Sequence, residues 1–227
     1  MIQPAVPINE RERLDALGEY NIIDTLPEEE FDSITRLASE ICGTPISLVT
    51  LITPDKQWFK SHHGTDIGEA GRELSFCGHA ILNPENILVV PDARKDARFA
   101  DNPLVTGQPN VIFYAGVPLV NPEGFPLGTL CIIDNYPRSI NKEQELMLKA
   151  LAAQVVKLFE LRKKNLELES SREQLKYRNE SLQKFAYTIS HDIRSPLNNI
   201  IGFTEVLKDY CSDKLDKEGL LFIEKIE

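Results

Sequence analysis

The sequence of 227 residues has no long hydrophobic run. Its longest apolar stretches, Ile46–Ile52 and Val111–Val120, are much shorter than the roughly 18–20 residues that cross a bilayer. The first residues, MIQPAVPINERER, lack the apolar segment of a secretory signal peptide. We therefore expect a cytoplasmic protein with no membrane contact.

Closely spaced cysteines and an excess of positive charge are also absent. The four cysteines form no C-x-x-C pair, which favours reduced thiols over a disulfide framework. The net charge is −10 and the isoelectric point is about 5.0. The one basic cluster, Arg162–Lys164, is flanked by Glu160 and Glu167. These features argue against a nucleic-acid partner.

Residues up to about 140 follow a mixed helical and extended pattern. Apolar residues recur at helical spacing over Glu29–Ile41, and Gly43-Thr-Pro45 ends that pattern. Turn residues at Pro54-Asp55 and Asn121–Gly124 connect β-branched segments into hairpins. The predicted strands cover residues 46–52, 57–62, 87–90, 111–120 and 127–133. Strands joined by tight turns, with helices at both ends, predict an α+β domain on an antiparallel sheet.

A long helix is predicted from about Asn141 onward. Glycine is absent from there until Gly202 and proline until Pro196. Written as heptads, four of the seven a positions and five of the six d positions are apolar. The a positions are Leu151, Leu158, Asn165, Arg172, Asn179, Ala186 and Ile193. The d positions are Gln154, Leu161, Leu168, Leu175, Leu182 and Ile189.

This heptad pattern favours a coiled coil over a single amphipathic helix packed on its own domain, because its register continues for six heptads. Polar Asn165, Arg172 and Asn179 recur at position a and weaken the contact between helices. A buried Asn pairs best with the same Asn of a second copy. The pattern therefore predicts a parallel, in-register homodimer.

One histidine occupies an outward position of this predicted coiled coil. With Ile189 at d and Ile193 at a, His191 falls at f, which faces away from the partner helix. A histidine there is exposed and available as a nucleophile. Asp192 follows it directly, and Pro196 removes a backbone hydrogen bond and is expected to kink the helix.

The residues around His191 resemble a known motif. Phe185–Ile200, FAYTISHDIRSPLNNI, is similar to the H-box of the dimerisation and histidine-phosphotransfer domain of sensor histidine kinases. The family pattern is Ser-His-(Glu/Asp)-aliphatic-Arg-(Thr/Ser)-Pro-Leu, and this chain matches it at every position. The alternative is a surface histidine in a kinked helix.

The resemblance implies roles for three residues. His191 Nε2 attacks the γ-phosphate of ATP, and Asp192 accepts a hydrogen bond from Nδ1–H, which fixes the tautomer. The phosphoryl group then passes to an aspartate of a response regulator. Ser195 occupies the position where family members with phosphatase activity carry Thr or Asn, so that activity stays open.

The resemblance does not extend to the ATP-binding domain of the family. No Asn-rich box, Asp-x-Gly-x-Gly loop or Walker-type loop is present in the sequence. We therefore expect ATP and Mg²⁺ to bind a domain outside this chain, a truncated piece that alone does not bind ATP. Residues Cys211–Asp216 are expected to form a loop. Lys217–Glu227 is expected to return antiparallel and to end short of His191.

The region from about Arg11 to Leu161 resembles a GAF domain through four motifs in order. They are Ser75–Ile81 (SFCGHAI), Val90–Ala93 (VPDA) with Arg98–Pro103 (RFADNP), Phe113–Leu119 (FYAGVPL) and Leu127–Asp134 (LGTLCIID). We expect a tail (1–10), a GAF sensor domain (11–150), a coiled-coil helix (151–184) and a partial phosphotransfer domain in a helical bundle (185–227).

The ligand of this sensor domain is not indicated by the sequence. Candidates to line its pocket are Phe76, Cys77, His79, Phe113, Tyr114 and Cys131, and ordinary core packing is the alternative for each. Related photoreceptors attach a bilin to a Cys followed directly by His, whereas Gly78 intervenes here. The cyclic-nucleotide motif of GAF phosphodiesterases is absent. No metal is expected, because adjacent His62 and His63 point to opposite faces of a strand.

Two functions from different classes fit these observations. The first is the sensor and phospho-acceptor part of a histidine kinase. The second is a non-enzymatic GAF dimer that binds a ligand or acts as a scaffold, with His191 idle. Phosphorylation by ATP in a version extended past Glu227 discriminates between them.

Overall fold

The computed structural model describes residues 1–211 and 216–226. It divides into two units, Met1–Leu166 and Glu167–Glu227, which are treated separately. Residues 212–215, most of the expected loop, lie outside the described part.

The first unit is an α+β domain, as predicted. Its helices are α1 (Glu10–Glu19), α2 (Glu29–Cys42), η1 (Arg72–Leu74), α3 (Phe76–Ala80), η2 (Ala93–Lys95), α4 (Pro103–Thr106) and the start of α5 (Lys142–Cys211). Its strands are β1 (Ile46–Ile52), β2 (Lys56–His63), β3 (Glu69–Gly71), β4 (Leu88–Val90), β5 (Phe113–Val120) and β6 (Pro126–Asp134). They form one antiparallel sheet in the order β3-β2-β1-β6-β5-β4.

Both predicted hairpins are present. At the first turn, Thr53 N donates to Lys56 O at 2.9 Å, and Thr53 Oγ1 accepts from Lys56 N at 3.1 Å. At the second turn, Asn121 Oδ1 accepts from Phe125 N at 2.8 Å, and Gly124 adopts a φ of 88°. A side chain that bonds the nearby backbone and a glycine with positive φ are what tight turns require.

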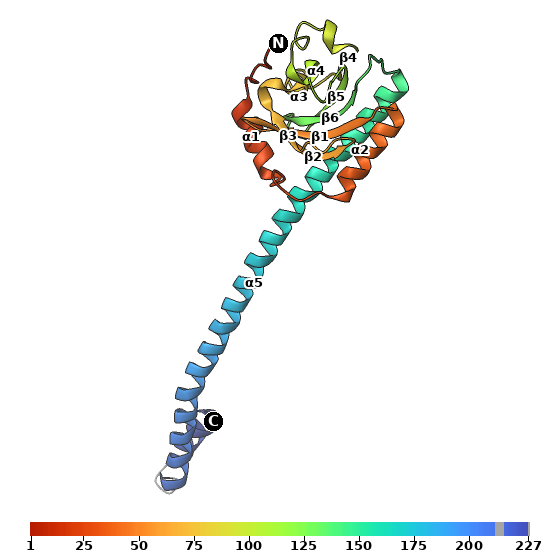
Figure 1. Ribbon diagram of the computed structural model, residues 1–227. Coiled ribbons are helices and arrows are strands. Elements are labelled where there is room, and N and C mark those ends of the chain that lie inside the picture. The colour runs from red at the N-terminus through yellow and green to blue at the C-terminus, as the bar shows by residue number, and fades with distance from the viewer. Residues whose placement is uncertain (212–215, 227) are drawn as a thin grey trace. The chain divides into compact units, whose positions relative to one another are not determined.

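Helices cover both faces of the sheet (Figure 1). One face carries α1, α2 and the start of α5, and its core includes Leu17, Ile34 and Phe159. The opposite face carries α3, η2 and α4, and its core includes Phe76, Phe99 and Val105. Because both faces are covered, all seven residues of β1 are buried.

Helix α2 agrees with its prediction. Its buried residues include Phe31, Ile34 and Ala38, which recur at the expected helical spacing. Gly43 caps it in the left-handed conformation, with a φ of 61°. Glycine reaches this conformation without steric cost, which explains why the helix ends there.

The N-terminal segment is fixed to the domain. Helix α1, which begins at Glu10, was not marked by the sequence pattern. Before it, Ile2 N donates to Arg98 O at 3.0 Å, and Ile2 O lies 2.9 Å from His79 Nε2. These contacts place the expected tail against the domain surface near α3.

Helix α5 begins as predicted and is 70 residues long. At its start, Gln144 N donates to Asn141 Oδ1 at 2.8 Å, and Asn141 N donates to Gln144 Oε1 at 3.1 Å. This reciprocal pair satisfies two backbone donors that the helix itself leaves without partners. Helical structure continues on both sides of Pro196, so the proline does not end the helix.

The second unit consists of α5 from Glu167 onward and α6 (Lys217–Ile226). Asp216 Oδ1 accepts from Gly219 N at 2.8 Å and so caps α6. Ile223 on α6 and Thr204 on α5 are buried, so part of the apolar face of each helix is covered.

Candidate functional site

His191 lies exposed on α5 beside Asp192. Their side chains are 71% and 70% exposed, and His191 Nδ1 lies 3.2 Å from Asp192 Oδ1. A carboxylate at this distance accepts a hydrogen bond from Nδ1–H and favours the tautomer whose Nε2 carries the lone pair. Because Asp192 engages Nδ1, Nε2 remains open to an incoming electrophile.

Ser195 follows on the same helix and is also exposed. It stands four residues after His191, which is about one turn of an α-helix. The structure therefore places all three sequence-predicted residues of this site on one short segment of α5.

The apolar d positions of α5 are uncovered in a single chain. Leu168, Leu175 and Leu182 are 68%, 63% and 65% exposed. Leucines repeated at seven-residue spacing on one exposed face form the stripe that a coiled-coil partner covers.

A second candidate site is an apolar cavity in the first unit, between the sheet and α3. Its volume is about 60 Å³. Of the six residues predicted to line it, Phe76, Cys77 and Tyr114 do so. Phe76 stacks on Phe99 with ring centroids 3.9 Å apart, which fixes one wall of the cavity.

The other three candidates lie elsewhere. Phe113 packs in the core on the opposite face of the sheet, because consecutive residues of a strand point to opposite faces. The rings of His79 and Phe99 are nearly perpendicular, and His79 Nε2 contacts Ile2 O rather than the cavity. Cys131 is buried behind Cys77, with the two Sγ atoms 3.9 Å apart.

Most residues that line the cavity are not among the sequence-predicted ones. Gln57 and Phe59 come from β2, where alternation places them on one face and was a usable signal. The remaining lining residues include Thr65, Ile67 and Leu104 on loops or short helices, which no periodic pattern marks.

Helix α3 is held at the cavity by its N-cap. Ser75 Oγ accepts from Gly78 N at 2.8 Å and donates to Gln57 Oε1 on β2. One hydroxyl thus caps the helix that carries Cys77 and ties it to a lining residue of the sheet.

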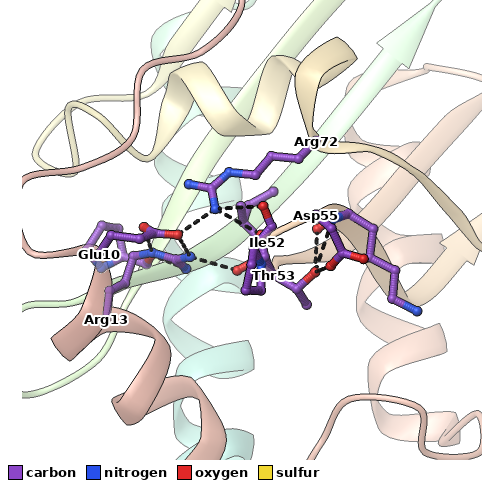
Figure 2. A network of polar contacts seen from close by, with 9 residues as sticks. Glu10, Arg13, Ile52, Thr53, Asp55 and Arg72 are labelled. Carbon is purple, nitrogen blue, oxygen red and sulfur yellow. Dashed lines mark hydrogen bonds and ion pairs between the residues drawn. The ribbon is translucent and has the colours of Figure 1, made fainter.

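A buried ion-pair network anchors the segment before α3 (Figure 2). Arg13 on α1 donates to both carboxylate oxygens of Glu10, at 2.8 and 2.9 Å, and to Ile52 O at 2.9 Å. Arg72 on η1 donates to Glu10 Oε1 at 2.5 Å and to Thr53 O at 3.0 Å. The network connects α1, the end of β1 and the chain that leads into α3.

Helix α5 is fastened to the end of α1 and the loop after it by residues about five turns from its start. Tyr20 Oη donates to Glu160 Oε1 at 2.5 Å, and burial raises the pKa of Tyr20, as does its bond to Glu160. Arg162 donates to Tyr20 O and Asn21 O, each at 3.1 Å. Phe159 packs between the rings of Tyr20 and Phe31. These contacts hold the part of α5 around Phe159–Arg162 firmly on the domain.

Within the described residues, no group of three or more His, Cys, Asp or Glu side chains is arranged to hold a metal ion. Among the same residues, no helix is long and apolar enough to cross a membrane.

The family model of the GAF domain matches residues 26–157, which is more than half of the chain. The chain belongs to the GAF domain family. The model of the His Kinase A (phospho-acceptor) domain matches residues 181–227 and contains His191. A GAF domain followed by this phospho-acceptor domain fits a sensor histidine kinase.

One curated relative is the cyclic di-GMP phosphodiesterase PA2567 of Pseudomonas aeruginosa, 37% identical over 156 residues. The match covers 69% of this chain and 26% of that protein, so the chain spans about a quarter of the relative's length.

Solved structures share the fold of the GAF domain. The GAF domain of an Acinetobacter phosphoenolpyruvate-protein phosphotransferase has 17% identity and a TM-score of 0.50, over 67% of this chain and 93% of that chain. Free methionine-R-sulfoxide reductase from Neisseria meningitidis has 18% identity and a TM-score of 0.50, over 68% and 90%.

Proposed function

We propose that this chain is the sensor and phospho-acceptor portion of a two-component histidine kinase. The GAF domain receives the input and controls ATP-dependent phosphorylation of His191, from which the phosphoryl group passes to an aspartate of a response regulator. The observation that carries the proposal is the exposed His191 with Nδ1 held by Asp192, inside the region that matches the phospho-acceptor domain.

The chemistry needs a neutral imidazole, because a protonated ring has no lone pair to offer. In the proposed step, the bond from Nε2 of His191 to the γ-phosphorus forms as the bond to the bridging oxygen breaks, and ADP leaves. Asp192 stabilises the positive charge that develops on the ring. ATP and Mg²⁺ are held by a domain outside this sequence. Ser195 is proposed to assist dephosphorylation.

The proposal includes a parallel homodimer in the cytoplasm. The stripe of exposed leucines at the d positions of α5 supports it, because each would be covered by the same residue of a second copy. Position f, where His191 lies, faces away from that seam. Glu160 and Arg162 of α5 contact the GAF domain directly, so a conformational change in the domain would act on the helix that carries His191.

The curated relative supports a role as an input module. In this chain, the GAF domain precedes a region that matches a phospho-acceptor domain. The similar segment of the relative is part of a cyclic di-GMP phosphodiesterase. The alternative function, a non-enzymatic GAF dimer with His191 idle, is separated from the proposal by the following experiment.

The experiment measures acid-labile phosphate in the protein extended past Glu227 to include an ATP-binding domain. We expect His191→Gln to abolish the label, whereas His62→Gln, a matched change of another exposed histidine, leaves it unchanged. Asp192→Asn should slow labelling by roughly 10²–10⁴-fold, the usual effect of losing a general base. Equal labelling of the wild type and His191→Gln would contradict the proposed function.

A further inference from the structure

Two buried thiols lie in contact next to the cavity of the GAF domain. Cys77 on α3 and Cys131 on β6 are 1% and 0% exposed, and both are free. Their Sγ atoms are 3.9 Å apart, which is close enough for a hydrogen bond between the thiols. Neither group has a part in the chemistry proposed for His191.

Three hydroxyls surround this pair inside an otherwise apolar core. Tyr114 Oη donates to Cys77 Sγ at 3.3 Å. Thr50 and Thr129, on the adjacent strands β1 and β6, are fully buried with their Oγ1 atoms 3.1 Å apart. A buried polar cluster is costly unless its members bond one another, so its presence needs a reason beyond packing.

The sheet leaves room for this cluster at Gly116. This residue pairs with Cys131 across β5 and β6. A Cβ at position 116 would lie only 2.1 Å from Tyr114 Oη. The glycine therefore creates the space through which the tyrosine hydroxyl reaches the thiols.

The two thiols differ in acidity. Burial opposes ionisation of Cys77, but the polar groups of Cys131, Thr129, Thr50 and Tyr114 around its sulfur outweigh burial and lower its pKa. Burial raises the pKa of Cys131, and a neighbouring Cys77 thiolate raises it further. Cys77 also lines the cavity and accepts a hydrogen bond from Tyr114, whereas Cys131 does not line it, so Cys77 is the thiol placed to react first.

The cavity gives a small molecule access to Cys77. The thiol lines the cavity, whose volume of about 60 Å³ exceeds the roughly 10–15 Å³ that one water molecule needs. The other lining side chains are mostly apolar, which favours an uncharged guest over an ion. Ile67, another lining residue, is exposed and marks the side that faces solvent.

We propose that Cys77 and Cys131 form an oxidisable dithiol site that takes a small, uncharged hydroperoxide and closes to a disulfide. In the first step, the Cys77 sulfur attacks one peroxide oxygen. The S–O bond forms, the O–O bond breaks, and the leaving oxygen takes the thiol proton to give an alcohol, or water from hydrogen peroxide.

In the second step, the Cys131 sulfur attacks the Cys77 sulfenic acid. The S–S bond forms, the S–O bond breaks, and hydroxide leaves with the Cys131 proton as water. The two sulfurs lose two electrons in total and the peroxide gains them.

Closure requires movement of α3. A disulfide is about 2 Å long, so the sulfurs must approach by roughly 2 Å. Strand β6 lies inside the sheet between β1 and β5, whereas α3 is a five-residue helix on its surface. The shift therefore falls on α3 and moves Phe76, which changes the shape of the cavity.

The test uses the full chain with Cys211→Ser, which leaves Cys42, Cys77 and Cys131 as its thiols. The folded protein is treated with hydrogen peroxide, alkylated after denaturation and digested without reductant. We expect a peptide that links Cys77 to Cys131. Its mass should be two hydrogen atoms below the sum of the two reduced, unalkylated peptides, and dithiothreitol should separate it into those two peptides. Cys42 is the matched control, because it is also buried and burial raises its pKa.

Two variants separate the steps. Cys131→Ser should stop at a sulfenic acid on Cys77 that dimedone traps, and Tyr114→Phe should slow oxidation several-fold because the thiolate loses one donor. Circular dichroism checks that each variant is folded, and the experiment on the Cys211→Ser chain decides alone if one is not. The proposal is wrong if the folded Cys211→Ser chain forms no Cys77–Cys131 link. It is equally wrong if Cys42 is oxidised at the same rate.

Discussion

Replacing Glu10 by Gln tests whether the network in Figure 2 holds α1 and the segment before α3 on the domain. The variant keeps the size of the side chain and removes its charge. Arg13 is fully buried, and both it and Arg72 direct guanidinium donors at the Glu10 carboxylate. In Glu10→Gln, two largely buried cations would share a neutral amide that offers a single acceptor atom.

The expected loss in the free energy of unfolding depends on the acceptors that Arg13 and Arg72 keep in the variant. Removal of one member of a buried ion pair costs about 3–5 kcal/mol. Arg13 keeps its bond to Ile52 O, Arg72 keeps its bond to Thr53 O, and the Glu10 side chain is 15% exposed. We therefore expect a loss of about 3 kcal/mol, the lower end of that range. At about 2–4 °C per kcal/mol for a domain of this size, the melting temperature should fall by about 6–12 °C.

The pH dependence gives an independent check. Burial opposes ionisation of Glu10, but its bonds to Arg13 and Arg72 outweigh burial and lower its pKa below the ordinary value of 4.5. A lowered carboxylate pKa adds stability that is fully present above 4.5 and is lost as the pH falls through the folded-state pKa. The difference between the wild type and Glu10→Gln should therefore be constant near neutral pH and shrink below pH 4.5.

Thermal unfolding followed by circular dichroism between neutral and acidic pH measures both effects. Glu12→Gln is the matched control, because Glu12 is an exposed carboxylate in the first turn of the same helix. It should cost no more than about 0.3–1 kcal/mol, the usual contribution of such a charge to the helix dipole. Equal destabilisation by the two variants, or a difference that persists unchanged at low pH, would refute the reasoning.

Two further predictions concern assembly and the sheet. Wild-type protein at micromolar concentration should have a mass near twice 25.7 kDa by light scattering. Serine at three d positions should make it monomeric, whereas Tyr177→Ser at an f position should not; a monomeric wild type would contradict the dimer. The three positions are Leu168, Leu175 and Leu182. Gly128→Ala should destabilise the domain by about 1–3 kcal/mol, because the new Cβ would lie 1.9 Å from Thr50 O. Gly18→Ala, with open space around it, should not be destabilising in the same unfolding assay.

The sheet and the long helix were predictable because their signals are local and repeated. Turn residues such as Asn121 and Gly124 mark the place where the chain reverses between two strands. The hydrogen bond that the Asn121 side chain accepts and the positive φ of Gly124 are both typical of these residue types in turns. In α5, the absence of glycine before Gly202 and the unbroken heptads extend the same signal over many turns.

Helix α1 gave no such signal, for a physical reason. Its buried face includes Arg13 beside Ala16 and Leu17, and the charge of Arg13 is compensated by Glu10 one turn earlier. A pattern of apolar residues cannot reveal a buried face that contains an ion pair. The contact with Arg72 joins positions 62 residues apart in the sequence, and only the folded chain brings them together.

The cavity shows where local patterns reach their limit. Alternation along β5 places Phe113 and Tyr114 on opposite faces of the sheet, so only one of these two candidates can line the cavity. Which side holds the cavity depends on where α3 packs, and strand periodicity contains no information about that.

Prediction of the thiol pair from the sequence would also require the register of the strands. Alternation places Tyr114 and Gly116 on the same face of β5, but the reason for a glycine appears only with the strand register, which sets Gly116 opposite Cys131. Cys77, which lies on helix α3 and 54 residues before Cys131 in the chain, contacts Cys131 only in the folded domain. A motif that reads as Phe-Tyr-Ala-Gly in the sequence thus becomes, across two strands and a helix, a tyrosine hydroxyl placed against a thiol. Because this placement arises from pairing and packing together, the oxidation of Cys77 and Cys131 tests the tertiary structure itself.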